Sequence, residues 1–217
     1  MGINEVWHQF MQDVVHTSIP EYIAVVAGIA SVWYSRKENI LVYPVGLVNT
    51  IIYAWLSFKY QLLGEASVNF YYTVMSLYGW YLWARRDAGH QPVMHVVFSD
   101  RRWWIYQLIF FLAFYVTIFF ALTYLKQNFW SGAIPWADAF ASATAFTGMW
   151  LMTKKKVESW YWWIATNCAS IPLYFVKHLV FTSVYYVILL VMAFYGLSEW
   201  MRRAKNSTPS QQPGYAG

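Results

Sequence analysis

Seven long stretches without charged side chains divide most of this chain of 217 residues. A helix needs about 20 mostly apolar residues to cross the hydrocarbon core of a bilayer. Six stretches contain no charged residue, and the fifth contains one, Asp138, near its start. They predict seven membrane-spanning helices at 22–35, 39–58, 66–84, 103–125, 134–152, 159–176 and 179–198.

The composition excludes an ordinary soluble domain. Charged residues make up 12% of the chain, about half the share of a typical soluble domain, and hydrophobic residues make up 59%. So little charge cannot cover so much apolar surface, and the same apolar content excludes a disordered chain. The single cysteine excludes a disulfide framework and any multi-cysteine metal site.

The two ends of the chain differ from the middle. In residues 1–18, apolar side chains from Ile3 to Val15 recur at helical spacing, which predicts an amphipathic helix lying in the membrane surface. Residues 204–217 are polar and contain two prolines, which predicts a disordered tail. We therefore expect the transmembrane domain to cover 19–203.

The basic residues predict the orientation in the membrane. If the seven stretches cross in turn, twelve of the 15 Lys and Arg fall on one side, and only Lys59, Lys126 and Lys177 fall on the other. Because Lys and Arg are retained on the cytoplasmic side, we expect the N-terminus outside and the C-terminus in the cytoplasm. The net charge of +5 is spread over four segments in this way, which argues against nucleic acid as a partner.

An internal repeat is visible in the third and seventh stretches. Both end in Tyr-Gly-x-x-x-Trp-x-Arg-Arg, and the two copies lie 117 residues apart. At the same offset Glu21 matches Asp138, and at an offset of 118 Asn49 matches Asn167. Helix ends in membranes often need Arg and Trp, but that need does not explain the constant spacing.

The repeat predicts the arrangement of the helices. Repeat one (21–86) and repeat two (134–203) contain three stretches each, and a linker helix (103–125) joins them. With one extra crossing between them, the two units point the same way and are related by an axis along the membrane normal. We therefore expect an all-α membrane protein with seven transmembrane helices in a 3+1+3 parallel repeat. This architecture is typical of transporters, and a seven-helix receptor has no need of it.

Candidate binding residues lie in the sixth stretch. Trp160, Trp163 and Asn167 are spaced i, i+3 and i+7, on one face of a helix. Two indoles and a carboxamide in this order favour a ligand with a flat, polar ring. Asn49 and Asn69 add two more carboxamides, which should face the bundle interior because an unpaired amide in hydrocarbon costs free energy.

Each candidate has a structural alternative. Asparagines also hold membrane helices together, and a tryptophan such as Trp160 also anchors helices at the membrane surface. Pro44 precedes Asn49 and Pro172 follows Asn167, so we expect interrupted helices beside both carboxamides.

The chain lacks the residues that energy coupling, cofactors or catalysis require. Asp138 is the sole acidic candidate for an ion site inside a stretch. The 5 His lie in loops or at the ends of stretches, which argues against a haem, and there is no phosphate-binding Gly-rich loop. We expect no cofactor and no metal, and a passive facilitator with a neutral, aromatic pocket. Such a pocket would also accept a cationic ring.

The pattern Trp160-x-x-Trp163-x-x-x-Asn167, preceded by Glu158, resembles the binding motif of the PnuC family of vitamin transporters. Two further patterns support the resemblance, which covers about 21–203: Gly46-Leu47-x-Asn49 and Tyr78-Gly79-Trp80-Tyr81-x-Trp83. The resemblance implies a SWEET-like fold and uptake of nicotinamide riboside across a bacterial inner membrane by facilitated diffusion. It also implies a cytoplasmic kinase that phosphorylates the riboside, so that the charged product cannot leave.

The resemblance leaves the vitamin open. The pyridinium ring of nicotinamide riboside fits the expected pocket, but relatives that carry thiamine make a thiamine facilitator the first alternative. Asn69 stands where another member has Gln. A seven-helix receptor or sensor is the alternative from another class, and a membrane enzyme is disfavoured because no catalytic constellation is present. The expected partners are the vitamin, the lipid bilayer and the kinase, and a homo-oligomer remains open.

Overall fold

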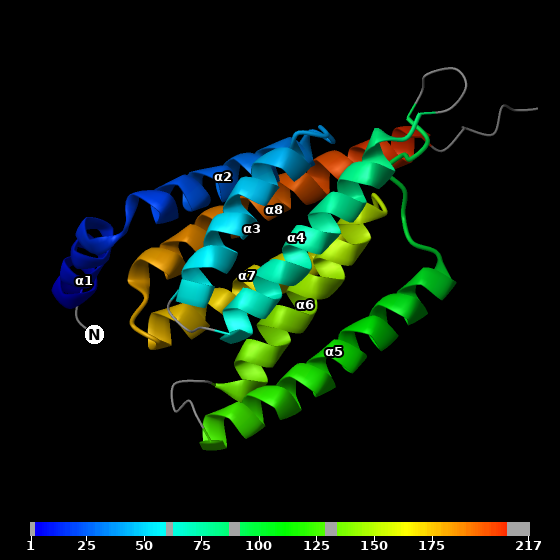
Figure 1. Cartoon of the computed structure of the whole chain (residues 1–217). Coiled ribbons are helices and arrows are strands. Elements are labelled where there is room, and N and C mark those ends of the chain that lie inside the picture. Colours follow the sequence, from blue (N-terminus) through cyan, green and yellow to red (C-terminus); the bar gives the residue numbers. More distant parts are fainter. Residues whose placement is uncertain (1–2, 60–62, 87–91, 129–133, 208–217) are drawn as a thin grey trace, which may run out of the picture.

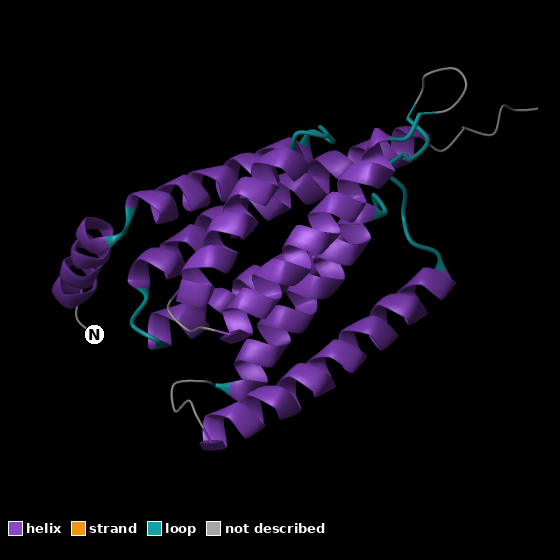
Figure 2. Cartoon of the chain, in the orientation of Figure 1, coloured by secondary structure: helices purple, strands orange, loops and turns teal. Residues whose placement is uncertain are grey.

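The computed structural model describes residues 3–59, 63–86, 92–128 and 134–207. These residues form eight helices and no strand (Figures 1 and 2), which confirms the all-α prediction. The helices are α1 (Ile3–His16), α2 (Ile19–Arg36), α3 (Val42–Lys59), α4 (Leu63–Ala84), α5 (Arg101–Asn128), α6 (Pro135–Thr153), α7 (Ser159–Val176) and α8 (Val180–Ser207).

Helices α2 to α8 lie at the seven predicted stretches. By length and composition alone, α5 and α8 could cross a membrane, and α1 and α2 qualify together as a pair bent by 107°. The other helices are shorter or less apolar, because polar side chains face their neighbours within the bundle. In α6, for example, Thr144, Thr147 and Thr153 are all buried.

Two local predictions differ from the structure. The sequence predicts a disordered tail from residue 204, but α8 continues to Ser207. Ala204 is buried in the hydrophobic core, which holds this last turn in place. Residues 208–217 lie outside the described part. The helices beside Asn49 and Asn167 are not interrupted. Pro44 lies in the first turn of α3, where its missing N–H has no intrahelical partner to lose, and α7 continues through Pro172.

Six helices form a closed ring of contacts in the order α2, α3, α4, α6, α7, α8 and back to α2. Opposite one another in this ring are α2 and α6, α3 and α7, and α4 and α8. Among the described helices, the backbone of α5 comes close to that of α6 alone, and α5 lies along the outside of the bundle (Figure 1). None of the residues in its most apolar window is buried, as suits a helix surrounded by lipid.

Helix α1 turns away from α2 and packs against the start of α8. Gln9 donates to the carbonyl of His178, Asp13 accepts from the backbone N–H of Phe181 at 3.2 Å, and the ring of Phe10 lies 6.2 Å from that of Phe181. Trp7 and Val15 are 63% and 73% exposed. That α1 lies in the membrane surface stays a prediction from the sequence.

One end of the bundle gathers the C-terminal ends of α2, α4, α6 and α8 (Figure 1). We call it the basic end, because most Lys and Arg of the chain lie at or just beyond these helix ends. They are Arg36, Lys37, Arg85, Arg86, Lys154, Lys155, Lys156, Arg202, Arg203 and Lys205. The buried hydrophobic core lies at the same end.

Candidate transport site

Trp163 of α7 lies inside the ring, against α6. A Cβ placed on Gly148 would lie 3.2 Å from Cε2 of Trp163, so the missing side chain of this glycine makes room for the indole. On another side the indole faces Tyr72 of α4, with the ring centroids 6.3 Å apart. The tryptophan that the sequence assigns to binding therefore packs on α6 and faces an aromatic ring of α4.

Asn167 lies one turn further along α7 and is only 3% exposed. Within the described residues its carboxamide makes no hydrogen bond to another group. Neither its oxygen nor its nitrogen is among the fully buried side-chain atoms that lack a partner, so both atoms keep some accessible surface. The amide can offer one acceptor and two donors to a bound molecule.

Trp160 does not share this setting. It is 2% exposed and its ring packs on the backbone of Gly196 in α8, edge-on to Trp200 with centroids 5.6 Å apart. Complete burial argues against the alternative of a surface anchor. Trp160 is part of the buried core at the basic end, and Trp163 packs against that core.

The two remaining candidates lie on the far side of the ring. Nδ2 of Asn49 in α3 donates to the carbonyl oxygen of Ala24 in α2 at 2.7 Å, so this carboxamide joins two helices. Asn69 lies in α4, where its own carbonyl accepts from the hydroxyl of Thr73 at 2.9 Å. Asn49 and Asn167 stand on opposite helices, and the structure does not bring their carboxamides into contact.

Sequence reasoning missed an aromatic wall on α4 and α6. The ring of Tyr71 stacks on Phe146 with centroids 4.1 Å apart, and its hydroxyl donates to the Phe146 carbonyl at 3.1 Å. Tyr72 meets the same phenylalanine edge-on at 6.1 Å. The adjacent tyrosines in the third stretch could have indicated an aromatic surface on that helix. Helical spacing alone does not show which neighbouring helix this surface contacts.

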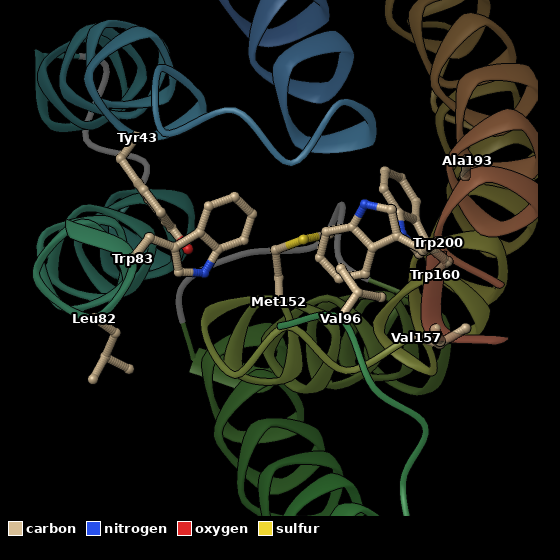
Figure 3. Packing of buried hydrophobic residues seen from close by; sticks show 10 residues of the cluster. Tyr43, Leu82, Trp83, Val96, Met152, Val157, Trp160, Ala193 and Trp200 are labelled. Carbon is tan, nitrogen blue, oxygen red and sulfur yellow. The ribbon is translucent and has the colours of Figure 1, made fainter. Parts of the chain in front are cut away.

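Four aromatic residues close the basic end around Met152 (Figure 3). Tyr43 meets Trp83 edge-on at 5.1 Å, and Trp160 meets Trp200 in the same way at 5.6 Å. Trp83 and Trp200, on the opposite helices α4 and α8, lie 6.1 Å apart. We call these four rings the aromatic cluster. All four side chains are buried, so the cluster packs tightly between the helices that carry it.

Residues 117 positions apart touch each other at this end. The hydroxyl of Ser35 donates to the sulfur of Met152 at 3.0 Å, and Lys155 pairs with Glu38 at 2.6 Å. Trp83 and Trp200 are a third such pair. When equivalent residues of two repeats meet, an axis relating the repeats passes between them. At this offset the counterpart of Asn49 is Thr166 rather than Asn167.

The ion pair between Glu38 and Lys155 is well enclosed. The Lys155 side chain is 5% exposed, and its ammonium also donates to the Met94 carbonyl at 2.9 Å and lies 4.6 Å above the Trp83 ring. Glu38 accepts a second ion pair from Arg203 of α8 at 3.2 Å. The pair therefore links the end of α2 to the turn after α6, directly beside the aromatic cluster.

Glu158, which precedes the predicted motif, has a structural task. Its buried carboxylate accepts from the backbone N–H and the hydroxyl of Ser99, the latter at 2.7 Å. Buried Gln107 of α5 donates to the same hydroxyl and accepts from the Trp162 indole at 2.9 Å. This chain of bonds fixes the loop before α5 to the start of α7.

Asp138, the sole acidic candidate for ion coupling, lies at the end of the bundle opposite the basic end. One of its oxygens pairs with Lys177 at 2.6 Å, and the other accepts from the backbone N–H of Ile134 at 2.8 Å. Both oxygens are occupied, so the carboxylate joins the start of α6 to the end of α7. In the part of the chain that is described, no three His, Cys, Asp or Glu side chains are grouped to hold a metal.

Comparisons with known proteins agree on one family. A sequence profile described as nicotinamide mononucleotide transporter matches residues 18–202. The nicotinamide riboside transporter PnuC of Escherichia coli is 22% identical over 211 residues, covering 85% of this chain and 86% of that protein. The riboflavin/roseoflavin transporter RibM of Streptomyces davaonensis is 22% identical over 197 residues, covering 89% of each.

A solved structure shares the fold. The crystal structure of the vitamin B3 transporter PnuC superposes with a TM-score of 0.66 and 21% identity, over 93% of this chain and 90% of that one. Together with the apolar helices, this likeness gives an all-α, multi-pass membrane protein. Its relatives are transporters and not enzymes. The chain therefore belongs to the nicotinamide mononucleotide transporter family.

Proposed function

We propose that this protein takes up nicotinamide riboside across a bacterial inner membrane by facilitated diffusion. The observation that carries the proposal is the unpartnered carboxamide of Asn167 beside Trp163, inside the ring of helices. An indole can stack on a pyridinium ring and attract its charge, and an amide can pair with the carboxamide of nicotinamide. Two of the relatives described above are named for vitamin B3 or its riboside.

The helices are proposed to form a 3+1+3 parallel repeat, with α2–α4 and α6–α8 as the two units and α5 as the linker. The closed ring supports this arrangement, since each helix stands opposite its proposed counterpart. The contacts at an offset of 117 support it as well. The basic end is proposed to face the cytoplasm, because Lys and Arg are retained on that side.

The aromatic cluster and the Glu38–Lys155 pair are proposed to form a gate at the cytoplasmic end. Substrate would enter from the other end, reach Trp163 and Asn167, and leave when the opposite helices separate at the basic end. The hydroxyl of Tyr43 and the indole N–H groups of Trp83 and Trp160 are buried without partners within the described residues. Separation would let water reach these groups, which lowers the free-energy difference between the closed and open states.

Net uptake is proposed to depend on trapping in the cytoplasm. A passive carrier only brings the riboside to its electrochemical equilibrium, so further accumulation needs a following reaction that removes the riboside. Phosphorylation by a cytoplasmic kinase supplies it, because the added phosphate is negatively charged and a neutral, aromatic site offers it no partner.

Riboflavin is the second candidate substrate, because one relative is named for it. Binding to the purified protein separates the candidates. Isothermal titration with nicotinamide riboside, nicotinamide mononucleotide, riboflavin and thiamine should give a clear signal for the riboside alone. Binding of riboflavin or thiamine in its place would move the assignment to that vitamin. No binding of any of them would end the vitamin proposal and leave the receptor alternative.

A further inference from the structure

A groove of about 370 Å³ opens at the basic end, beside the turn between α6 and α7. Its walls bring together two lysines, a histidine and an indole from three segments of the chain. Lys154 and Lys156 come from the turn, Met94 and His95 from the loop before α5, and Trp103 from the first turn of α5. The groove lies outside the proposed transport path, and its lining carries no acidic side chain.

Lys156 is a cation with no ion pair. Within the described residues no carboxylate lies within ion-pair distance of its ammonium, which sits 4.9 Å above the Trp103 ring. Burial lowers the pKa of Lys156, although Glu158 and Asp100 act in the opposite direction. Both carboxylates already accept hydrogen bonds from neutral groups of the loop and of α5. An anion in the groove would therefore be the first negatively charged group in direct contact with the Lys156 ammonium.

The groove is held in shape by the backbone. The N–H of Val97 donates to the carbonyl of Lys155 at 3.1 Å, and the N–H of Val157 donates to the carbonyl of Val97 at 3.1 Å. The Lys154 ammonium donates to the hydroxyl of Tyr78 at 2.6 Å. The backbone on both sides of Lys156 and the Lys154 side chain are thus held in place, so less freedom remains to be lost when an anion binds.

We propose that this groove binds the phosphate of an anionic phospholipid headgroup. Two ammonium groups match a phosphate in charge, and a glycerol-bearing headgroup can lie against Trp103. The exposed apolar side chains at the rim favour a lipid over a soluble phosphate: Val97, Phe98 and Trp104 are 40%, 41% and 38% exposed. They lie where α5 begins, at the headgroup level of a helix that is surrounded by lipid.

The test uses the full-length protein in neutral detergent, titrated with short-chain phosphatidylglycerol, phosphatidylcholine of the same chain length, or inorganic phosphate. Native mass spectrometry counts bound lipid, and thermal unfolding reports stabilisation. We expect phosphatidylglycerol to bind and stabilise, and Lys156→Gln to weaken its binding about fivefold. Lys156→Arg should retain binding, which also covers the case in which the glutamine variant does not fold.

Lys37→Gln is the matched control. Lys37 also lies over an indole, 5.0 Å from the ring of Trp33, but it is exposed and does not line this groove. Its loss should leave lipid binding unchanged. Equal binding of phosphatidylcholine, or full retention in Lys156→Gln, would overturn the proposal. Stabilisation by inorganic phosphate that phosphatidylglycerol does not reproduce would overturn the lipid assignment and leave a site for a soluble anion.

Discussion

Three glycines each receive a large aromatic ring from a neighbouring helix. The pairs are Gly79 with Tyr43, Gly148 with Trp163, and Gly196 with Trp160. A Cβ would overlap the ring at Gly79 and at Gly196, where no other residue fits without a shift, and would lie 3.2 Å from the ring at Gly148, where the contact would be tight. These contacts set the positions of the rings in the aromatic cluster and of Trp163 in the site.

Gly196→Ala should destabilise the protein by about 1–3 kcal/mol, because the added methyl overlaps the buried Trp160 ring. Gly46→Ala is the matched control: the nearest atom to its new Cβ is Cβ of Ser31 at 3.6 Å, which is an ordinary contact. Alanine favours a helix over glycine, so this variant should be neutral or slightly stabilised. Thermal unfolding in detergent measures both, and equal midpoints would contradict the packing argument.

Asn167→Leu and Trp163→Ala should each weaken binding of nicotinamide riboside at least tenfold, or about 1.4 kcal/mol. The first removes the amide that pairs with the ligand, and the second removes the stacking surface. Trp55→Ala is a control, because that ring is 54% exposed on the outer face of α3. Unchanged affinity in folded variants of Asn167 and Trp163 would assign both residues to packing.

The sequence places these residues on one helical face, but it does not give their neighbours. Spacing along α7 groups Trp160 with Trp163, yet their environments diverge because α8 presents Gly196 to one and α6 presents Gly148 to the other. Asn49 matches Asn167 at an offset of 118, but the Asn49 amide donates a hydrogen bond to the Ala24 carbonyl. Which helix a face meets is decided by the ring of contacts, and that is a property of the tertiary structure.

At the level of elements, the turns after α2 and α6 have the same construction. Glu38 and Lys155 both have left-handed backbones, with φ of 57° and 51°. Their N–H groups bond back to the carbonyls of Ser35 and Met152 in the same manner. A non-glycine residue in this conformation costs about 1–2 kcal/mol. Here the ion pair between the two side chains offsets that cost.

Glu38→Gln should destabilise the closed protein more than Lys155→Met. Without Glu38, the buried Lys155 ammonium keeps only the Met94 carbonyl and the Trp83 ring, and loss of one partner from a buried pair costs about 3–5 kcal/mol. Without Lys155, Glu38 still pairs with Arg203. Thermal unfolding of both variants gives the order, and the reverse order would refute this account of the pair.

Asp138→Asn is the control for that measurement. It removes an ion pair at the opposite end of the bundle, where both side chains are partly exposed to 19% and 25%. Such pairs contribute roughly 1 kcal/mol or less, so the change in stability should be small. Transport should also persist in this variant, because the carboxylate is tied to Lys177 and to the start of α6. Loss of transport in a normally folded variant would instead indicate that Asp138 takes part in ion coupling.

For the whole molecule, the charge-free runs located the seven helices α2 to α8, and the spacing of apolar residues located α1. The closed ring of helices could not be predicted in the same way. The contacts that close it, between α4 and α6 and between α8 and α2, join helices that are not consecutive in the sequence. The loop that Glu158 and Ser99 fix beside α7 was equally invisible, because its stabilising bonds come from residues 59 positions apart.

The whole ring also bears on energetics. Inside it, Trp163 packs against Gly148 and Tyr72, and Asp138, the one acidic side chain within a predicted stretch, is paired with Lys177 at one end of the bundle. A site of this kind offers no group to bind or release a coupling proton. Uptake by cells that contain the riboside kinase should therefore continue when a protonophore collapses the proton gradient.

The same reasoning predicts two different outcomes when the kinase is absent. Net accumulation in cells should stop, because nothing removes the free riboside from the cytoplasm. Exchange should continue, because the carrier itself needs no kinase: proteoliposomes loaded with unlabelled nicotinamide riboside should take up labelled riboside with no gradient and no nucleotide present. If exchange also required the kinase, or stopped on addition of the protonophore, passive transport through the neutral ring would be refuted. If exchange failed under every condition while the protein still bound the riboside, the receptor alternative would replace the carrier.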